Sequence, residues 1–154
     1  MVIHLATDHA GFVHKEAVST WLKSEGYTIV DHGAYEDDPL DDYPDFISLA
    51  AAEVSKNPAG AKAIVFGGSG QGEAMVANRF PNVRATVYYG GDEEIISLSR
   101  QHNDANVLSI GARFVDIDTC KKMVWKWLHT DFFTEEKYQR RNKKISVITK
   151  KIHT

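Results

Sequence analysis

Cysteine and long apolar runs are both scarce in this chain of 154 residues. Cys120 is the only cysteine, which excludes an internal disulfide framework and a thiolate metal cage and is typical of a reducing compartment. No apolar run approaches the roughly 20 residues that a membrane helix needs. The first residues, MVIHLATDH, have neither the basic start nor the long apolar stretch of a signal peptide. We therefore expect a soluble cytoplasmic protein.

A large excess of one charge sign is also absent. The formal net charge is −3, which argues against nucleic acid or an anionic membrane as a partner of the whole chain. The most basic segment, RRNKKISVITKKIHT (140–154), has no aromatic residues on which bases could stack, and we interpret it as a helix with a solvated end. With 43% hydrophobic residues the chain can form the core of one domain, which we expect to span residues 1–154.

Short β-rich runs alternate with helical patterns along the whole chain. Strands are expected at 2–7, 27–31, 61–66, 83–89 and 106–111, and helices at 15–26, 44–57, 73–80, 92–103, 119–130 and about 134–150. Such alternation predicts right-handed βαβ units. We therefore predict an α/β fold, with a single doubly wound, five-stranded parallel sheet and helices on both faces, as in Rossmann-like domains.

The spacing around Cys120 assigns this thiol to the core. Cys120, Met123, Val124, Trp127 and Leu128 follow one another at i, i+3, i+4, i+7 and i+8, which is typical of a helix with one buried face. We therefore interpret Cys120 as a core residue and not as a nucleophile.

The longest irregular stretch is acidic and contains two prolines, GAYEDDPLDDYPD (33–45). It is too long for an ordinary connection, so we expect it to overhang a functional site. Its carboxylates could bind a hard cation, but they show no ordered ligand pattern, and a solvated loop is the preferred interpretation.

The stretch GGSGQGE (67–73) directly follows the strand expected at 61–66. In doubly wound sheets, ligands bind beyond the carboxyl ends of the strands, and glycines let backbone N–H groups approach an anion or a developing oxyanion. Ser69 adds a hydroxyl and Glu73 a carboxylate. The spacing matches neither the phosphate loop of nucleotide hydrolases nor the dinucleotide fingerprint. Taken alone, it is equally compatible with a tight turn in which Glu73 complements a helix dipole.

Other polar groups are expected near this turn. TDHAGF (7–12) ends the first strand with Asp8 and His9, and SRQHNDANVLSIGAR (99–113) carries His102, Asn103 and Arg113 around the last strand. We expect all of them to lie along one edge of the sheet. The other five histidines match no ligand spacing and are interpreted as structural or surface residues: His4, His14, His32, His129 and His153.

Together these segments resemble the type B ribose-5-phosphate isomerase family, which also contains galactose-6-phosphate and allose-6-phosphate isomerases. The matching segments are TDHAGF, DDYPDF (41–46), GGSGQGEAMVAN (67–78), SRQHNDANVLSIGAR and, more weakly, EKYQRRNKKI (136–145). Members of the family interconvert a phosphorylated aldose and ketose through an enediolate, without a metal or an organic cofactor. The resemblance thus implies an aldose-ketose isomerase, with ribose 5-phosphate and ribulose 5-phosphate as the first substrate pair to consider.

The resemblance also implies a role for individual residues. Glu73 would be the base that moves a proton between adjacent carbons, Ser69 would help to stabilise the oxyanion, and Asp8 and His102 would handle the protons of ring opening. The other implied substrate contacts are Gly68, Gly70, Gln71 and Gly72 in the glycine turn, Tyr43 and Asn103 at the sugar hydroxyls, and His9, Arg113, Lys137 and Arg141 at the phosphate.

Two departures from the usual family pattern concern the base and the phosphate site. Many members carry a cysteine base in a CGTGIG pattern, and Gly67 stands at the position of that cysteine. Another branch reads GGSGNGE and uses its glutamate, and this chain follows that second pattern. The C-terminal helix of the family usually reads RHxRR, whereas Lys137 and Tyr138 occupy its first two places here. Lys137 keeps the positive charge but not the bidentate fork of an arginine.

In this family the C-terminal helix contributes to a site shared between subunits. The resemblance therefore implies a homodimer or a dimer of dimers, in which the helix at about 134–150 packs on a neighbouring subunit.

Two alternatives to this function stay open. One is the same chemistry on erythrose 4-phosphate, allose 6-phosphate or galactose 6-phosphate. The other is a noncatalytic module that binds a phosphorylated metabolite. Glu73 argues against that module, because a carboxylate repels a bound phosphate whereas proton abstraction needs a base.

Overall fold

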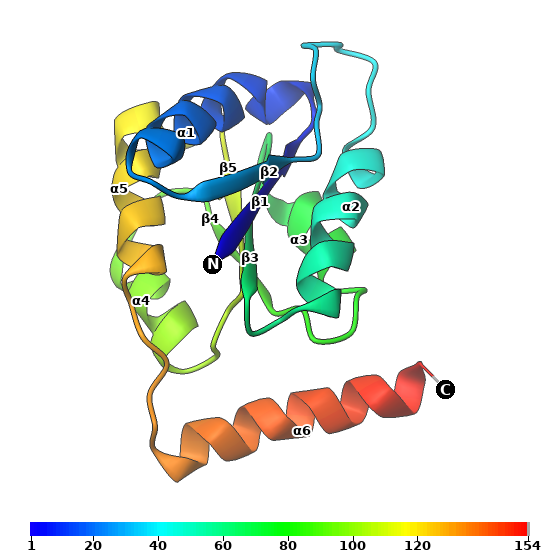
Figure 1. Cartoon of the computed structure of the whole chain (residues 1–154), viewed down its shortest axis with the longest axis vertical. Coiled ribbons are helices and arrows are strands. Elements are labelled where there is room, and N and C mark those ends of the chain that lie inside the picture. The colour runs from blue at the N-terminus through cyan, green and yellow to red at the C-terminus, as the bar shows by residue number, and fades with distance from the viewer. Residues whose placement is uncertain (154) are drawn as a thin grey trace.

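A five-stranded parallel sheet forms the centre of the protein, as a computed structural model that describes residues 1–153 shows (Figure 1). The strands are β1 (Val2–Thr7), β2 (Thr28–Asp31), β3 (Ala61–Gly67), β4 (Ala85–Tyr88) and β5 (Val107–Gly111). Their spatial order is β2-β1-β3-β5-β4, and every neighbouring pair is parallel. The predicted doubly wound sheet is therefore confirmed.

Helices cover both faces of this sheet (Figure 1). They are the short η1 (His9–Gly11), α1 (Phe12–Ser24), α2 (Tyr43–Lys56), α3 (Gln71–Ala77), α4 (Glu94–Gln101), α5 (Ile117–Leu128) and α6 (Glu136–Ile152). Helices α1, α4 and α5 contribute to one hydrophobic core, and α2 and α3 contribute to the other. The bounds differ from the predicted ones by up to three residues: α1 begins three residues earlier than its pattern indicated, and α3 ends three residues earlier.

Alternate side chains of β3 supply the two cores. Ile64 and Phe66 join the core under α1 and α5, whereas Ala63 and Val65 join the core under α2. Successive residues of a strand point to opposite faces, so a strand that is covered on both sides is apolar throughout. Cys120 lies in the first of these cores, fully buried as predicted, and burial raises the pKa of its thiol to about 12.

Helix α6 differs from the other α-helices, because none of its residues is buried. It lies apart from the layers that cover the sheet, at the end of an extended segment (Figure 1). Ile145, Val147 and Ile148 on this helix are each at least 44% exposed. Across residues 1–153, no helix combines the length and the apolar character that crossing a membrane requires.

Candidate active site

The order of the strands creates a switch point between β1 and β3. After β1 the chain passes through α1 to β2, and after β3 it passes through α3 toward the opposite edge of the sheet. Two adjacent strands whose connections leave in opposite directions open a crevice at their carboxyl ends. A cleft of about 490 Å³ lies at this point, lined by Asp8, His9, Ala10, Tyr43, Gly68, Ser69, Gly72, Glu73, Arg113 and Phe114.

The glycine turn joins β3 to α3 within four residues. Gly70 caps α3 with a left-handed φ of 77°, and a Cβ atom on it would come within 3.0 Å of the backbone nitrogen of Gly111. Both the conformation and the space therefore require glycine here. The turn is further held by Ser109, whose hydroxyl donates to the Gly70 carbonyl at 2.6 Å. This rigid turn carries Ser69 and Glu73 into the cleft.

The Glu73 carboxylate occupies the space that a side chain on Gly67 would need. A Cβ atom on Gly67 would overlap Oε1 and Cδ of Glu73. Glu73 is only 4% exposed. Burial raises the pKa of this carboxyl group, and the neighbouring charge of Asp8 raises it further. A buried carboxylate of raised pKa, bordering a cleft, is suited to proton transfer.

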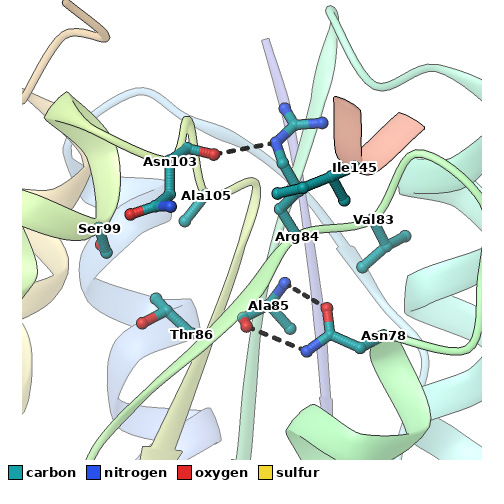
Figure 2. Close-up of a pocket in the computed structure, with 9 residues that line it drawn as sticks. All are labelled: Asn78, Val83, Arg84, Ala85, Thr86, Ser99, Asn103, Ala105 and Ile145. Carbon is teal, nitrogen blue, oxygen red and sulfur yellow. Dashed lines mark hydrogen bonds between the residues drawn. The ribbon is translucent and has the colours of Figure 1, made fainter. Parts of the chain in front are cut away.

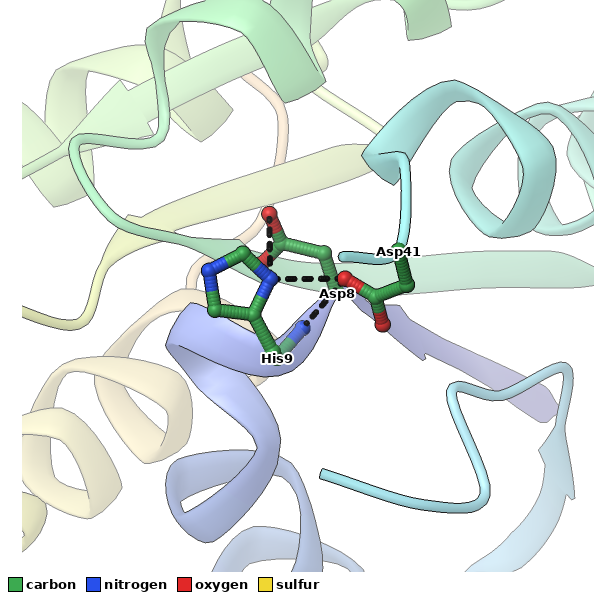
Figure 3. Close-up of side chains that lie close together, drawn as sticks. All are labelled: Asp8, His9 and Asp41. Atoms are coloured by element: carbon green, nitrogen blue, oxygen red, sulfur yellow. Dashed lines mark hydrogen bonds and ion pairs between the residues drawn. The ribbon is translucent and has the colours of Figure 1, made fainter. Parts of the chain in front are cut away.

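Asp8 and His9 follow β1 directly, and Asp41 reaches them from the connection between β2 and α2 (Figure 3). The Asp8 carboxylate accepts a hydrogen bond from the Ala10 N–H at 3.0 Å, which fixes it at the start of η1. The ring Nδ1 of His9 lies 2.7 Å from Oδ1 of Asp41 and 3.9 Å from Oδ2 of Asp8. One side-chain oxygen or ring nitrogen of each of these three residues lies within 4.8 Å of those of the other two. The acidic loop thus reaches the site, as its length suggested.

Arg113 adds a positive charge on the far side of the glycine turn. It follows β5, its backbone N–H donates to the Gly68 carbonyl at 3.1 Å, and its guanidinium group packs against Gly68. Ser69 is exposed, and its hydroxyl oxygen accepts a hydrogen bond from the Gln71 N–H at 3.3 Å. The Gln71 side chain, by contrast, borders a neighbouring cleft beside Met75.

His102 and Asn103 lie near the amino ends of the strands, opposite the carboxyl ends where the glycine turn lies. The expectation that they would share one edge of the sheet with the glycine turn is therefore wrong. They end α4 and precede β5, whereas Gly111 at the end of β5 pairs with Gly67. In a parallel sheet, a residue before a strand and a residue after it lie at opposite edges. The four residue steps of β5, Val107–Gly111, alone span roughly 13 Å at about 3.3 Å per residue.

A second group of predicted residues gathers around His102. The ring of Tyr138 stacks on His102, with centroids 4.4 Å apart and planes inclined by 8°. Lys137 places its ammonium nitrogen 4.8 Å from the Tyr138 centroid, and the Arg141 guanidinium lies 5.9 Å from it. Asn142 of α6 donates to the His102 carbonyl at 2.9 Å. These contacts attach α6 to the end of α4.

Asn103 borders a separate cleft of about 270 Å³ at the amino end of β4 (Figure 2). Its carbonyl accepts a hydrogen bond from Nε of Arg84 at 3.1 Å, and Ile145 of α6 closes one side. The predicted site residues therefore fall into two groups within one chain. One lies around Glu73, and the other lies around His102.

Two residues of the first group were not predicted from the sequence. Phe114 lines the cleft next to Arg113, and Asp41 holds His9. Asp41 begins the segment DDYPDF, and that segment together with the length of the acidic loop pointed to this part of the chain without assigning Asp41 a role.

Comparison with known proteins identifies the family. The sequence profile described as Ribose/Galactose Isomerase matches residues 3–145. The chain belongs to the ribose/galactose isomerase family. The probable ribose-5-phosphate isomerase B of Mycoplasma genitalium is 38% identical over 143 residues, which cover 93% of this chain and 92% of that protein. The ribose-5-phosphate isomerase B of Mycobacterium tuberculosis is 34% identical over 141 residues, which cover 92% of this chain and 85% of that protein.

Solved structures in the ribose/galactose isomerase family have the same fold. The M. genitalium ribose-5-phosphate isomerase B, crystallised with bound ribulose-5-phosphate, superposes with a TM-score of 0.92 at 37% identity and covers 97% of this chain and 96% of its own. The ribose-5-phosphate isomerase B of Clostridium thermocellum gives a TM-score of 0.90 at 34% identity, with 99% of each chain covered. The match extends over almost the whole chain, so the Rossmann-like fold is shared throughout.

Proposed function

We propose that this chain is one isomerase domain that interconverts ribose 5-phosphate and ribulose 5-phosphate through an enediolate, without a metal or an organic cofactor. The observation that carries the proposal is the buried Glu73 carboxylate, which borders the cleft at the switch point between β1 and β3. The relative from M. genitalium, crystallised with bound ribulose-5-phosphate, supports a five-carbon sugar phosphate as the ligand.

In the proposed reaction, Glu73 takes the proton from C2 of the open-chain aldose and returns it to C1. The raised pKa of its carboxyl group makes it a stronger base than an exposed glutamate. The enediolate oxygen is stabilised by Ser69 and by N–H groups of the glycine turn at Gly70, Gln71 and Gly72. Asp8, beside Glu73, takes part in opening the sugar ring.

The phosphate is bound by positive groups at the rim of the cleft. His9 and Arg113 both line the cleft that contains Glu73 and carry or can carry a positive charge. Lys137 and Arg141 of α6 are two further predicted phosphate ligands, and in one chain they lie beside His102 and not beside this cleft.

A second copy of the chain supplies the missing half of the site. His102, Asn103 and the cations of α6 lie at the opposite edge of their own sheet, while α6 leaves Ile145, Val147 and Ile148 exposed. A symmetric dimer buries the same surface on both copies, so each partner can bring its His102 to the Glu73 of the other. We infer a homodimer, or a dimer of such dimers. In it, Tyr43 of one copy and Asn103 of the partner subunit hold the sugar hydroxyls.

The Glu73→Gln variant tests the proposal. We expect isomerisation of ribose 5-phosphate, and exchange of its C2 proton with solvent, to fall by roughly 10²- to 10⁴-fold, because the amide cannot act as a base. Binding of inorganic phosphate should persist. The matched control is Glu25→Gln, which changes an exposed glutamate at the end of α1. An excess of chelator should leave turnover of the native protein unchanged.

Substrate choice and the noncatalytic alternative are separated in the same assay. Erythrose 4-phosphate, allose 6-phosphate and galactose 6-phosphate are run in parallel with ribose 5-phosphate, and we expect the pentose to give the highest kcat/KM. If the native protein binds these sugars without exchanging or converting any of them, it is a phosphometabolite-binding module. The proposed cytoplasmic location is checked by cell fractionation.

A further inference from the structure

The contact between Asp41 and His9 joins the acidic loop to the end of β1. Oδ1 of Asp41 accepts two hydrogen bonds from His9, one from its backbone N–H at 3.0 Å and one from the ring at Nδ1 at 2.7 Å (Figure 3). An ionised carboxylate can only accept hydrogen bonds, so this contact assigns a proton to Nδ1. A single oxygen thus fixes both the main chain and the ring of His9.

Asp41 does not reach the substrate cleft itself. Its side chain is 8% exposed, and among residues 1–153 it borders a different hollow, beside Ala34, Tyr35 and Phe46. His9 lies between Asp41 and the cleft, which it lines. Any influence of Asp41 on a bound molecule must therefore pass through His9.

The loop that carries Asp41 is anchored to β1. Thr7 donates to the Gly33 carbonyl and accepts from the Ala34 N–H, both at 2.8 Å. The end of β2, just before this loop, is fixed as well, because the ammonium group of the buried Lys15 lies 2.6 Å from the Asp31 carboxylate. Asp41 is thus presented by a backbone that is bonded to β1, the strand that His9 closely follows.

The charges around His9 favour its cationic form. The hydrogen bond to Asp41 is the largest cause that raises the pKa of His9, and the charges of Asp8 and Asp41 add to it. Burial and the charge of Arg113 act in the opposite direction. With Nδ1–H bonded to Asp41, Nε2 is the free ring nitrogen. It is a lone-pair acceptor in the neutral ring and a donor only in the cation.

We propose that Asp41 is a positioning residue for phosphate recognition, which holds His9 through Nδ1 so that Nε2–H serves as a cationic donor to the phosphate of the substrate. The inference rests on the proposed function, since it assumes a sugar phosphate in the cleft. A neutral His9 with its proton on Nδ1 would turn a lone pair toward the phosphate and weaken binding. Asp41 therefore acts on substrate affinity and not on the proton transfer at Glu73.

The Asp41→Asn variant keeps the size of the side chain and removes its charge. At about pH 7.5 we expect the KM for ribose 5-phosphate and the Kd for inorganic phosphate to rise by about five- to tenfold, the loss of one charge-assisted hydrogen bond. The value of kcat should change less than about twofold, because saturating substrate compensates for weak binding. The KM difference from the native protein should shrink as the pH falls, because acid protonates His9 in both proteins.

NMR titration of the His9 ring and a double-mutant cycle separate positioning from a merely structural role. The pKa of His9 should fall in Asp41→Asn and stay unchanged in the control Asp37→Asn, which removes an exposed charge from the same loop. In a His9→Asn background, Asp41→Asn should have almost no further effect on phosphate binding. A loop-holding role would instead weaken phosphate binding equally in both backgrounds.

The outcomes for Asp41 and for the proposed function can be told apart. Phosphate binding and the His9 titration need no turnover, so they test Asp41 even if the chain does not isomerise any sugar. The proposal is overturned if Asp41→Asn leaves the His9 titration and the phosphate Kd unchanged, or if its effect persists without His9. Neither result would change the conclusion drawn from a loss of isomerase activity in Glu73→Gln, which tests the proposed function.

Discussion

At the scale of single residues, Gly67 and Glu73 compete for the same space. The carboxylate of Glu73 lies where the Cβ atom of any other residue at 67 would have to be. A cysteine base at 67 and a glutamate base at 73 in its present place therefore exclude each other in this fold. The absence of a side chain at 67 is what allows the Glu73 carboxylate to lie where it does.

This exclusion predicts the behaviour of Gly67→Cys. The new side chain should displace the Glu73 carboxylate, lower the free energy of unfolding by about 1–3 kcal/mol through overpacking, and lower kcat by at least about tenfold. Shortening the competing side chain, in Gly67→Cys/Glu73→Ala, should restore most of the lost stability, as measured by urea unfolding. Additive losses of stability in the double variant would show that the two side chains do not compete.

In the proposed reaction, the pKa of Glu73 sets the acid limb of the pH–activity profile. The base works only when it is ionised, so kcat/KM should fall as the pH drops through a pKa that lies above the ordinary value of 4.5. Because the charge of Asp8 contributes to this shift, the limb should move to lower pH in Asp8→Asn, whatever the absolute rate of that variant. A limb that does not move would contradict the coupling between the two carboxyl groups.

At the scale of elements, two histidines join β1 to the end of β2. Nδ1 of His4 lies 2.8 Å from Nε2 of His32. Burial lowers the pKa of both rings, the charge of His32 lowers that of His4 further, and Glu53 and Asp31 partly oppose this. Neither ring can accept a second proton without losing this contact or paying for desolvation of its charge.

The pair predicts a loss of stability in mild acid. Both folded-state pKa values lie below the ordinary 6.5, so the unfolded chain binds protons first, and the stabilisation present above pH 6.5 is lost as the pH falls through the folded values. The free energy of unfolding should therefore fall between about pH 7.5 and about pH 5, and this fall should be smaller in His4→Gln. The exposed His153→Gln is the control; an equal pH dependence in all three proteins would contradict the prediction.

The sequence could predict those site residues that follow a strand. Asp8 and His9 after β1, Glu73 after β3 and Arg113 after β5 meet at one edge, because the carboxyl ends of parallel strands always do. His102 was misplaced because it precedes β5, and the motif that contains it runs from one edge of the sheet to the other.

Contacts made by loops could not be predicted in this way. The bond from Asp41 to His9 depends on the path of the connection between β2 and α2, which periodicity does not describe. The same holds for the stacking of Tyr138 on His102, since the extended segment before α6 sets where this helix lies. The ring of Tyr138 supports His102 from this position.

At the scale of the whole molecule, one chain holds two halves of a proposed active site at opposite edges of its sheet. The half around Glu73 would supply the proposed base, the glycine turn and the two proposed phosphate ligands, His9 and Arg113. The half around His102 would supply the proposed acid for ring opening and the cations of α6, a helix that buries none of its residues in its own chain. A symmetric pair of chains would join each half to its complement.

The most direct test of this account is the activity of a mixed dimer. Glu73→Gln and His102→Ala chains, each inactive alone, are produced together with different tags, and the species that carries both tags is isolated. One of its two sites then combines a native Glu73 with a native His102 from the other chain. We predict about half of the native dimer's kcat with ribose 5-phosphate. A mixed dimer no more active than its inactive parents, or no doubly tagged species at all, would contradict a site shared between two copies.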